Sequence, residues 1–189
     1  MRVFIGGSRE LTSLSSDVQA RLDNIVQQEF TVLVGDANGI DRTVQQHLLG
    51  QAYRQVLVYC AGARCRNNLG QWETHHVAPP HATKDFDYYA AKDTEMAVAA
   101  DYGCMIWNGK SAGTLRNVLN LLQRSKTTLV YLEPQQRFQT IATGADLEKL
   151  LAFCAAADVA VFERKLKLSQ TLAALAQPAA STQQLTLLT

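Results

Sequence analysis

Short apolar segments alternate along the chain with longer segments in which apolar residues recur every three or four positions. The short segments are rich in β-branched and aromatic residues, and their continuous apolar character is typical of strands covered on both faces. They cover residues 2–5, 31–34, 55–60, 102–107 and 127–132. The longer segments follow one face of a helix. Their apolar positions are Val18, Leu22, Ile25 and Val26; Ile40, Val44 and Leu48; Leu115, Val118, Leu119 and Leu122; and Leu147, Leu150, Leu151 and Cys154.

One more helix is predicted over residues 86–100, where helix propensity is a stronger signal than the apolar stripe. Strands separated by helices imply right-handed crossovers and parallel pairing. The pattern therefore predicts an α/β fold, a Rossmann-like three-layer sandwich with a mainly parallel sheet. Residues 1–168 are expected to form this domain.

Two stretches interrupt the alternation. Residues 61–84 collect Gly, Pro, Asn and His, which predicts a long irregular loop of functional importance or high mobility. Residues 169–189 are polar and interrupted by proline, which predicts a loosely ordered tail. Within that tail, three leucines are candidates for docking on a partner subunit: Leu185, Leu187 and Leu188.

Composition places the chain among ordinary globular domains. It has 189 residues, 47% of them hydrophobic, and a formal net charge of +1, which allows one domain with a normal core. The interspersed charges supply no overall field for gripping DNA or an anionic membrane. No apolar stretch approaches the roughly 18 residues that indicate a membrane span. The opening segment reaches Gly6 after too few apolar residues for a secretory signal, so we expect a cytoplasmic location.

The four cysteines lack a CxxC spacing, and most lie in apolar runs, which favours buried thiols. A zinc site is the alternative for a group that is close together in the sequence. This group comprises Cys60, Cys65, His75, His76 and His81. Its spacing matches none of the usual ligand pairs, so a plain loop with surface histidines is preferred and no metal is expected.

Three glycine-containing turns follow strands of the predicted sheet. They read GGSRE at residues 6–10, GDANGID at 35–41 and NGKSAGT at 108–114. In an open parallel sheet the carboxyl ends of the strands share one edge, where helix N-termini direct unpaired N–H groups into a crevice. Glycine allows the backbone to approach a bound group closely. Together the turns predict a phosphate-binding loop, although none matches the dinucleotide or Walker fingerprint.

The residues expected to contact the ligand lie in these turns and on the helix before the third. They are Gly7, Ser8, Arg9, Gly35, Asp36, Lys92, Gly109, Lys110, Ser111, Ala112, Gly113 and Thr114. Phosphate would lie against the N–H groups of residues 111–114, because the first amides of a helix are unpaired donors at the positive end of its dipole. Asp36 would contact a ribose hydroxyl.

Structural interpretations stay open for several of these residues and their neighbours. Ser111 can simply cap the following helix, and Arg9 can form a surface ion pair with Glu10. Asp41 can cap the second helix or complement its dipole. The polar run at residues 66–68 is expected to be solvated surface.

The turn motifs, KDTEM at residues 92–96, and ADYGCMIWNGKSAGTLRNVLNLL at residues 100–122 together resemble the SLOG superfamily. That group includes the DNA-processing protein A, the cytokinin-activating proteins called lonely guy, and the YspA-like, cpYpsA-related members, which are the most similar branch. The resemblance covers about residues 1–132. It implies a Rossmann-like domain that binds nucleotides or nucleotide-derived ligands at the third turn, often as a homodimer.

In the hydrolase branch the third turn is written P-G-G-x-G-T-x-x-E, and its glutamate pairs with an upstream arginine to cleave a base from a ribose phosphate. This chain retains Gly113 and Thr114 but has Asn117 at the glutamate position and Lys92 at the arginine position. Asparagine cannot ionise, so that mechanism does not transfer to this chain. The nearby carboxylates that could substitute are Asp93, Glu95 and Asp101.

We therefore expect a protein that binds a nucleotide or ADP-ribose-like molecule as a sensor or carrier, with no additional cofactor. An N-glycosidic hydrolase or transferase acting on nucleoside phosphates is the alternative. Single-stranded DNA binding is a second alternative, disfavoured because the chain lacks a basic balance. A homodimer or larger homo-oligomer is expected, since apolar positions in residues 147–162 and in the tail need covering by a partner or by the chain itself.

Overall fold

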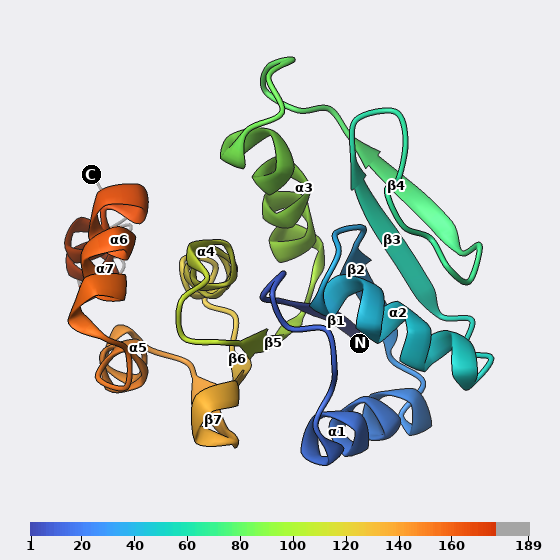
Figure 1. Ribbon diagram of the computed structural model, residues 1–189, viewed down its shortest axis with the longest axis horizontal. Coiled ribbons are helices and arrows are strands. Elements are labelled where there is room, and N and C mark those ends of the chain that lie inside the picture. Colours follow the sequence, from blue (N-terminus) through green and yellow to red (C-terminus); the bar gives the residue numbers. More distant parts are fainter. Residues whose placement is uncertain (177–189) are drawn as a thin grey trace, which may run out of the picture.

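A computed structural model describes residues 1–176, in which seven strands form one sheet with the order β4-β3-β2-β1-β5-β6-β7 (Figure 1). All neighbouring strands are parallel except β6 and β7. The strands are β1 (Arg2–Gly7), β2 (Thr31–Gly35), β3 (Val56–Ala61), β4 (Glu73–Val77), β5 (Tyr102–Trp107), β6 (Thr128–Leu132) and β7 (Arg137–Ile141). The predicted α/β fold with a mainly parallel sheet is confirmed.

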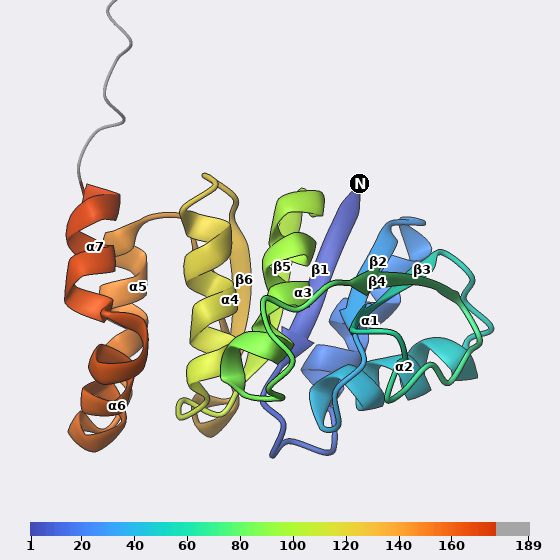
Figure 2. The same cartoon turned by 90° about the horizontal axis from the view of Figure 1, so that it is seen from above.

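Helices cover both faces of this sheet, which makes a three-layer arrangement (Figures 1 and 2). They are α1 (Ser16–Gln27), α2 (Ile40–Gly50), α3 (Phe86–Ala99), α4 (Ala112–Leu122), α5 (Gly144–Leu151), α6 (Ala156–Leu166) and α7 (Leu168–Ala176). None of the helices in residues 1–176 is both long enough and apolar enough to span a membrane.

Successive side chains along the strands pack alternately into two hydrophobic cores, one on each face of the sheet. In β1, Val3 and Ile5 pack with the buried faces of α1 and α2, whereas Phe4, between them in sequence, packs with α3 and α4. All three side chains are at most 1% exposed. Burial of such a side chain stabilises the fold by roughly 1.5–3 kcal/mol. Because both faces of the central strands are buried, their sequences are continuously apolar.

Two strands were not expected from the sequence. β4 lies inside residues 61–84, so the prediction of a wholly irregular loop there is wrong. It forms an edge of the sheet and buries only Val77, so its sequence ETHHV carries little apolar signal. β7 forms the opposite edge, pairs antiparallel with β6 and buries only Ile141. Edge strands expose most of their side chains, so their sequences contain no continuous apolar run from which they could be predicted.

The C-terminal helices form a layer at the β7 end of the sheet (Figure 1). Leu147, Leu150 and Phe162 are each 0% exposed and belong to the core around α4, so the chain itself covers these apolar positions. Residues 169–176 lie in α7 rather than in a loose tail, because Leu172 and Leu175 pack against the same core. The predicted docking leucines lie in residues 177–189, outside the described residues.

The cysteine prediction needs correction. Cys60 at the end of β3 and Cys65 in the following loop form a disulfide, with their Cα atoms 5.0 Å apart. Cys104 is a buried free thiol, as expected, and Cys154 is a partly buried one. A spacing of five residues is not a motif, and only the reversal of the chain after β3 brings the two sulfurs together. Two of the residues considered for zinc are thus bonded to each other.

Candidate functional site

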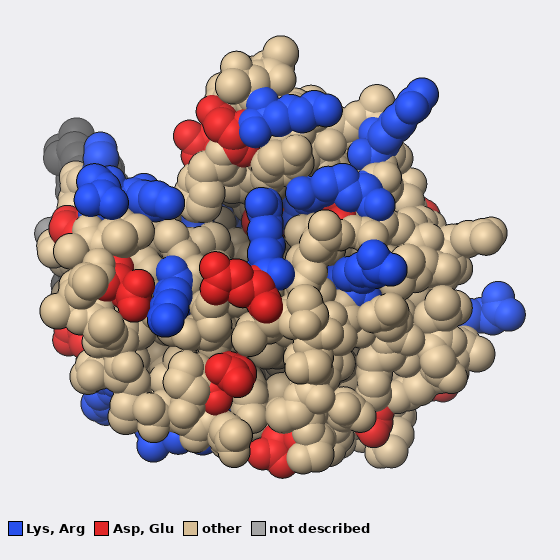
Figure 3. All heavy atoms as spheres, viewed as in Figure 1, with Lys and Arg blue, Asp and Glu red and all other residues tan. Residues whose placement is uncertain are grey.

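A pocket of about 530 Å³ lies at the carboxyl edge of the central strands, between the turns after β1 and β5 and the facing parts of α3 and α4. This edge faces the viewer in Figure 3, where Lys and Arg side chains gather over the middle of the molecule. The pocket is lined by five cationic residues: Arg9, Lys84, Lys92, Lys110 and Arg116. Its size suits a small molecule rather than a single ion.

The turn after β1 is joined firmly to the turn after β5. Ser8 is 0% exposed, and its hydroxyl donates to Asn108 Oδ1 at 2.9 Å while accepting the backbone N–H of Asn108 at 3.1 Å. The Asn108 side chain also donates to Glu10 Oε2 at 3.0 Å. Buried polar groups with matched partners fix a single geometry, so both turns are held in one relative position.

The third turn is partly satisfied by the protein itself. Asn108 Oδ1 accepts the backbone N–H groups of Lys110 and Ser111, each at 3.0 Å. The Ser111 hydroxyl accepts the N–H of Thr114 at 3.3 Å and the hydroxyl of Thr114 at 3.0 Å. Ser111 is therefore the N-cap of α4. We expected phosphate to contact the N–H groups of Ser111 and Thr114, but both groups already have partners within the protein.

Two amides at the start of α4 have no partner among the described residues: the N–H groups of Ala112 and Gly113. Gly113 lines the pocket. A Cβ added at Gly113 would lie 3.8 Å from the ring of Phe86, which shows that this ring stands beside the helix start. The first turn of α4 carries no acidic residue. An unpaired pair of N–H groups at the positive end of a helix dipole attracts an anion.

Two aromatic rings of the pocket wall, Phe86 and Tyr89, each carry an arginine. The guanidinium carbon of Arg116 lies 5.0 Å from the centre of the Phe86 ring, and that of Arg9 lies 5.4 Å from the centre of the Tyr89 ring. Arg116 also pairs with Asp87 at 2.7 Å. Cation–π contacts restrict where a guanidinium can point. The alternative of an Arg9–Glu10 ion pair is not found, and Glu10 Oε2 instead accepts from the Asn108 side chain.

A buried charge cluster forms the floor of the pocket. Lys92 is 3% exposed, and its Nζ lies 2.6 Å from Asp93 Oδ1 and 3.8 Å from Asp41 Oδ2. Burial lowers the pKa of Lys92 and the two carboxylates raise it, with a net rise. Burial raises the pKa of Asp41 to about 6. The predicted phosphate ligand Lys92 does line the pocket, although its ammonium group is already paired.

Glycine is required at position 35 for this cluster to form. A Cβ on Gly35 would overlap both the Asp41 carboxylate and the Lys92 ammonium group. Asp41 in turn accepts the backbone N–H of Ala37 at 3.2 Å, so it holds the turn after β2. The role of Gly35 is thus to make room for charged side chains.

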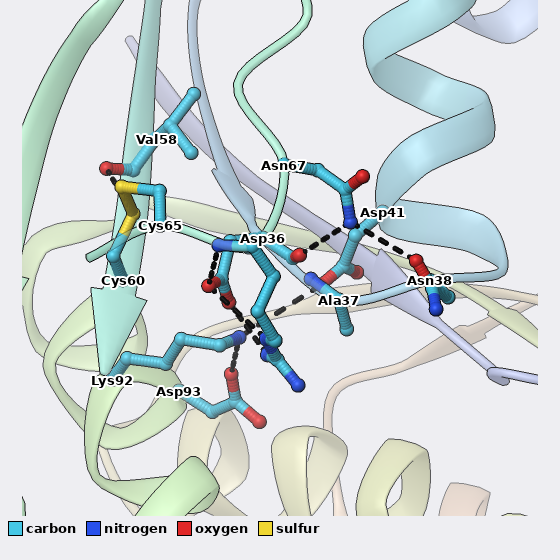
Figure 4. A network of polar contacts seen from close by, with 12 residues as sticks. Asp36, Ala37, Asn38, Asp41, Val58, Cys60, Cys65, Asn67, Lys92 and Asp93 are labelled. Carbon is cyan, nitrogen blue, oxygen red and sulfur yellow. Dashed lines mark hydrogen bonds and ion pairs between the residues drawn. A yellow bond between two sulfur atoms is a disulfide. The ribbon is translucent and has the colours of Figure 1, made fainter. Parts of the chain in front are cut away.

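Asp36 is paired with a residue that the sequence pattern assigned to the surface. Its carboxylate, 1% exposed, accepts from Arg66 through the backbone N–H at 3.0 Å, Nε at 3.2 Å and the terminal guanidinium nitrogen at 2.6 Å. Burial raises the pKa of Asp36, the contacts with Arg66 lower it, and the net direction is downward. Asn67 donates to the Asp36 carbonyl at 2.8 Å (Figure 4). The predicted polar run at residues 66–68 does lie at the surface, with Arg66 exposed, but it also holds the turn after β2 through these contacts.

The pocket lining includes most of the ligand residues expected from the sequence, namely Gly7, Ser8, Arg9, Lys92, Lys110, Ser111, Gly113 and Thr114. Gly35, Asp36, Gly109 and Ala112 do not contribute to that lining. Sequence reasoning missed Asn108, although it stands in the third turn, and it also missed Phe86, Tyr89 and Arg116. Phe86 and Tyr89 lie on α3 and Arg116 lies on α4, and these positions come together only when the chain folds.

Asn117, at the position of the hydrolase glutamate, lines the pocket and is 7% exposed. Its side-chain oxygen is buried and has no hydrogen-bond partner. Of the carboxylates considered as substitutes, only Asp93 lines the pocket. Glu95 contacts His75 at 2.8 Å, and Asp101 accepts the N–H of Arg2, at the start of β1.

The chain matches no model of a known protein family, and it matches no curated protein. The fold and the chemistry of this pocket are therefore the basis for assigning a function.

Proposed function

We propose that the pocket binds a nucleotide or a nucleotide-derived molecule through its phosphate, and that the protein acts as a sensor or carrier of that ligand. The observation that carries the proposal is the pair of unpartnered N–H groups of Ala112 and Gly113, at the start of α4 beside a pocket of about 530 Å³. A phosphate oxygen placed there would receive two backbone hydrogen bonds in the direction of the helix dipole.

The charges around the pocket support an anionic ligand. The carboxylate of Asp93 is paired with Lys92 on the floor, whereas Arg9 and Lys110 form no ion pair with any residue that the structure describes. Lys110 is exposed, so its ammonium group is free to move toward a ligand. Cations without a carboxylate partner lose little when they bind phosphate, and each charge-assisted hydrogen bond contributes about 1.5–3 kcal/mol.

The remainder of the ligand has space and apolar surface. Phe86 and Tyr89 present aromatic rings to the pocket, and ligand sites commonly combine such apolar walls with a few polar groups. The resemblance of the glycine turns to the SLOG superfamily supports the same ligand class. The expected ribose contact of Asp36 is not part of the proposal, because Arg66 holds that carboxylate outside the pocket lining.

Isothermal titration with AMP, adenosine and inorganic phosphate tests the proposal. AMP should bind, and adenosine should bind at least tenfold more weakly because it lacks the group that the amides hold. Lys110→Ala should raise the Kd for AMP by about tenfold, the effect of one charge-assisted hydrogen bond. Lys149→Ala, an exposed lysine on α5, is the matched control and should leave the Kd unchanged. Equal binding of adenosine and AMP would refute the phosphate site.

A hydrolase or transferase acting on nucleoside phosphates is the second candidate, favoured by one observation. Asp41 lines the pocket, and burial raises its pKa to about 6, a value suited to a general acid near neutral pH. In its protonated form it could donate to a departing base while water attacks the ribose carbon. Release of adenine from AMP that Asp41→Asn or Asp93→Asn abolishes, and that the control Glu95→Gln retains, would establish this activity. Tight binding without turnover would exclude it.

A further inference from the structure

The disulfide between Cys60 and Cys65, drawn in Figure 4, adjoins in sequence the residue that supports the pocket wall. Arg66 follows Cys65 directly in the sequence, and its side chain and backbone N–H both bind Asp36. The same guanidinium lies 4.3 Å from the centre of the Tyr89 ring. Tyr89 lines the pocket. Two residues, Arg66 and Tyr89, thus connect the disulfide to the ligand site.

The segment that carries Arg66 has few other attachments. Before it, the Gly62 N–H bonds to the Val77 carbonyl at 2.9 Å; after it, the Leu69 N–H bonds to Gln45 Oε1 at 3.0 Å. Between these points, the Asn67 side chain donates to the Asp36 carbonyl at 2.8 Å and to Asn38 Oδ1 at 3.1 Å, whereas Ala63 and Arg64, before the second cysteine, are exposed. The disulfide therefore restrains the part of the segment before Arg66, and with the Asn67 contacts it holds the conformation in which Arg66 reaches both Asp36 and Tyr89.

The two sulfurs differ in their surroundings. Cys60 is 0% exposed, whereas Cys65 is partly exposed. Attack by an outside thiolate depends on access, so Cys65 Sγ is the sulfur that a reductant reaches. Once released, Cys60 would have a hydrogen-bond acceptor in place, because its Sγ lies 3.9 Å from the Val58 carbonyl oxygen. The buried thiol of the reduced form is thereby accommodated without rearrangement of β3.

We propose that Cys60–Cys65 is a thiol–disulfide exchange site, and that its reduction by a dithiol releases the segment that holds Arg66 against the pocket wall. A thiolate of the dithiol attacks Cys65 Sγ, the S–S bond breaks, and the electron pair passes to Cys60, which takes up a proton. The second thiolate of the dithiol then attacks the dithiol's first sulfur in the mixed disulfide. Cys65 leaves as a thiolate and takes up the second proton. The protein gains two electrons and two protons, and the dithiol becomes a disulfide.

Reduction here would remove a restraint on Arg66 and hence on Tyr89, so the pocket would be less well organised for its ligand. Ligand affinity should therefore be higher in the oxidised protein. This consequence for affinity rests on the proposed function, whereas the release of the segment does not.

Hydrogen exchange of the intact protein, measured before and after treatment with dithiothreitol, tests the release. Mass spectrometry after alkylation of the native protein should show that Cys60 and Cys65 become thiols. Peptides that contain the Arg66 amide should then exchange about tenfold faster, and Cys65→Ser should reproduce this rate without reductant. The control Cys154→Ser should behave as the wild type. Peptides from α2 should be unaffected in every case.

The ligand readout is the Kd for AMP in the oxidised and reduced proteins, with an expected rise of about tenfold on reduction. A bond that resists millimolar dithiothreitol in the native protein, or exchange at Arg66 that stays the same after reduction, would overturn the proposal. Faster exchange with an unchanged Kd would overturn the proposed effect of reduction on ligand affinity. If AMP binds in neither state, the proposed function fails, and the exchange rates still decide whether the segment is released.

Discussion

Replacing Asp41 with asparagine should stabilise the protein at neutral pH, because it removes a carboxylate that ionises in a buried site. Asparagine retains an oxygen that can accept the N–H of Ala37, as the Asp41 carboxylate does at 3.2 Å. Lys92 keeps its closer partner, Asp93, at 2.6 Å. The main change is therefore the loss of an ionisation rather than the loss of a contact.

The magnitude follows from the pKa of Asp41, which burial raises from 3.8 to about 6. A rise of about 2 pH units corresponds to about 3 kcal/mol. Because the folded-state pKa lies above the unfolded one, the folded state binds more protons between about pH 4 and 6. The contribution of Asp41 to the free energy of unfolding therefore falls as pH rises through that window, and it stays at its lower value above pH 6.

Urea unfolding followed by circular dichroism at several pH values measures this effect. The difference in unfolding free energy, Asp41→Asn minus wild type, should grow by about 3 kcal/mol between about pH 4 and 7. Asp146→Asn is a control of opposite sign, because the hydroxyl of Thr143 lowers the pKa of Asp146. A difference for Asp41→Asn that stays within about 0.5 kcal/mol across this range would refute the reasoning.

Three substitutions test other contacts by urea unfolding. Ser8→Ala should cost about 1–3 kcal/mol, because it leaves the buried N–H of Asn108 without its partner. Arg66→Ala should cost about 2 kcal/mol, since Asp36 keeps only a backbone donor; the 33% exposure of the arginine side chain reduces the effect of a buried pair. Leu150→Ala should cost about 2–5 kcal/mol through a core cavity. A loss below about 0.5 kcal/mol would contradict the contact concerned.

The central part of the fold is predictable because its strands are buried on both faces. β1, β2, β3, β5 and β6 all have continuous apolar sequences, and each was located from that character. The edge strands β4 and β7 expose most side chains, so their positions depend on pairing with β3 and β6 and not on their own sequences. The helix over residues 169–176 was missed because its apolar face is completed only by packing on the C-terminal core.

The candidate site was predictable in place but not in detail. Glycine turns at one sheet edge located the pocket, since topology alone brings the ends of parallel strands together. The turns could not show that Asn108 satisfies the amides of Lys110 and Ser111, because its side chain could equally have faced solvent. The pairing of Asp36 with Arg66 joins residues 30 positions apart and leaves no local signal.

The most direct test of the account is an amide NMR titration of the protein with AMP. The N–H groups of Ala112 and Gly113 should show the largest downfield shifts, because they alone at the start of α4 are free to donate to a phosphate. The N–H groups of Lys110 and Ser111, which already bond to Asn108, should move less. Saturation with AMP while Ala112 and Gly113 remain unshifted would contradict the proposed phosphate site.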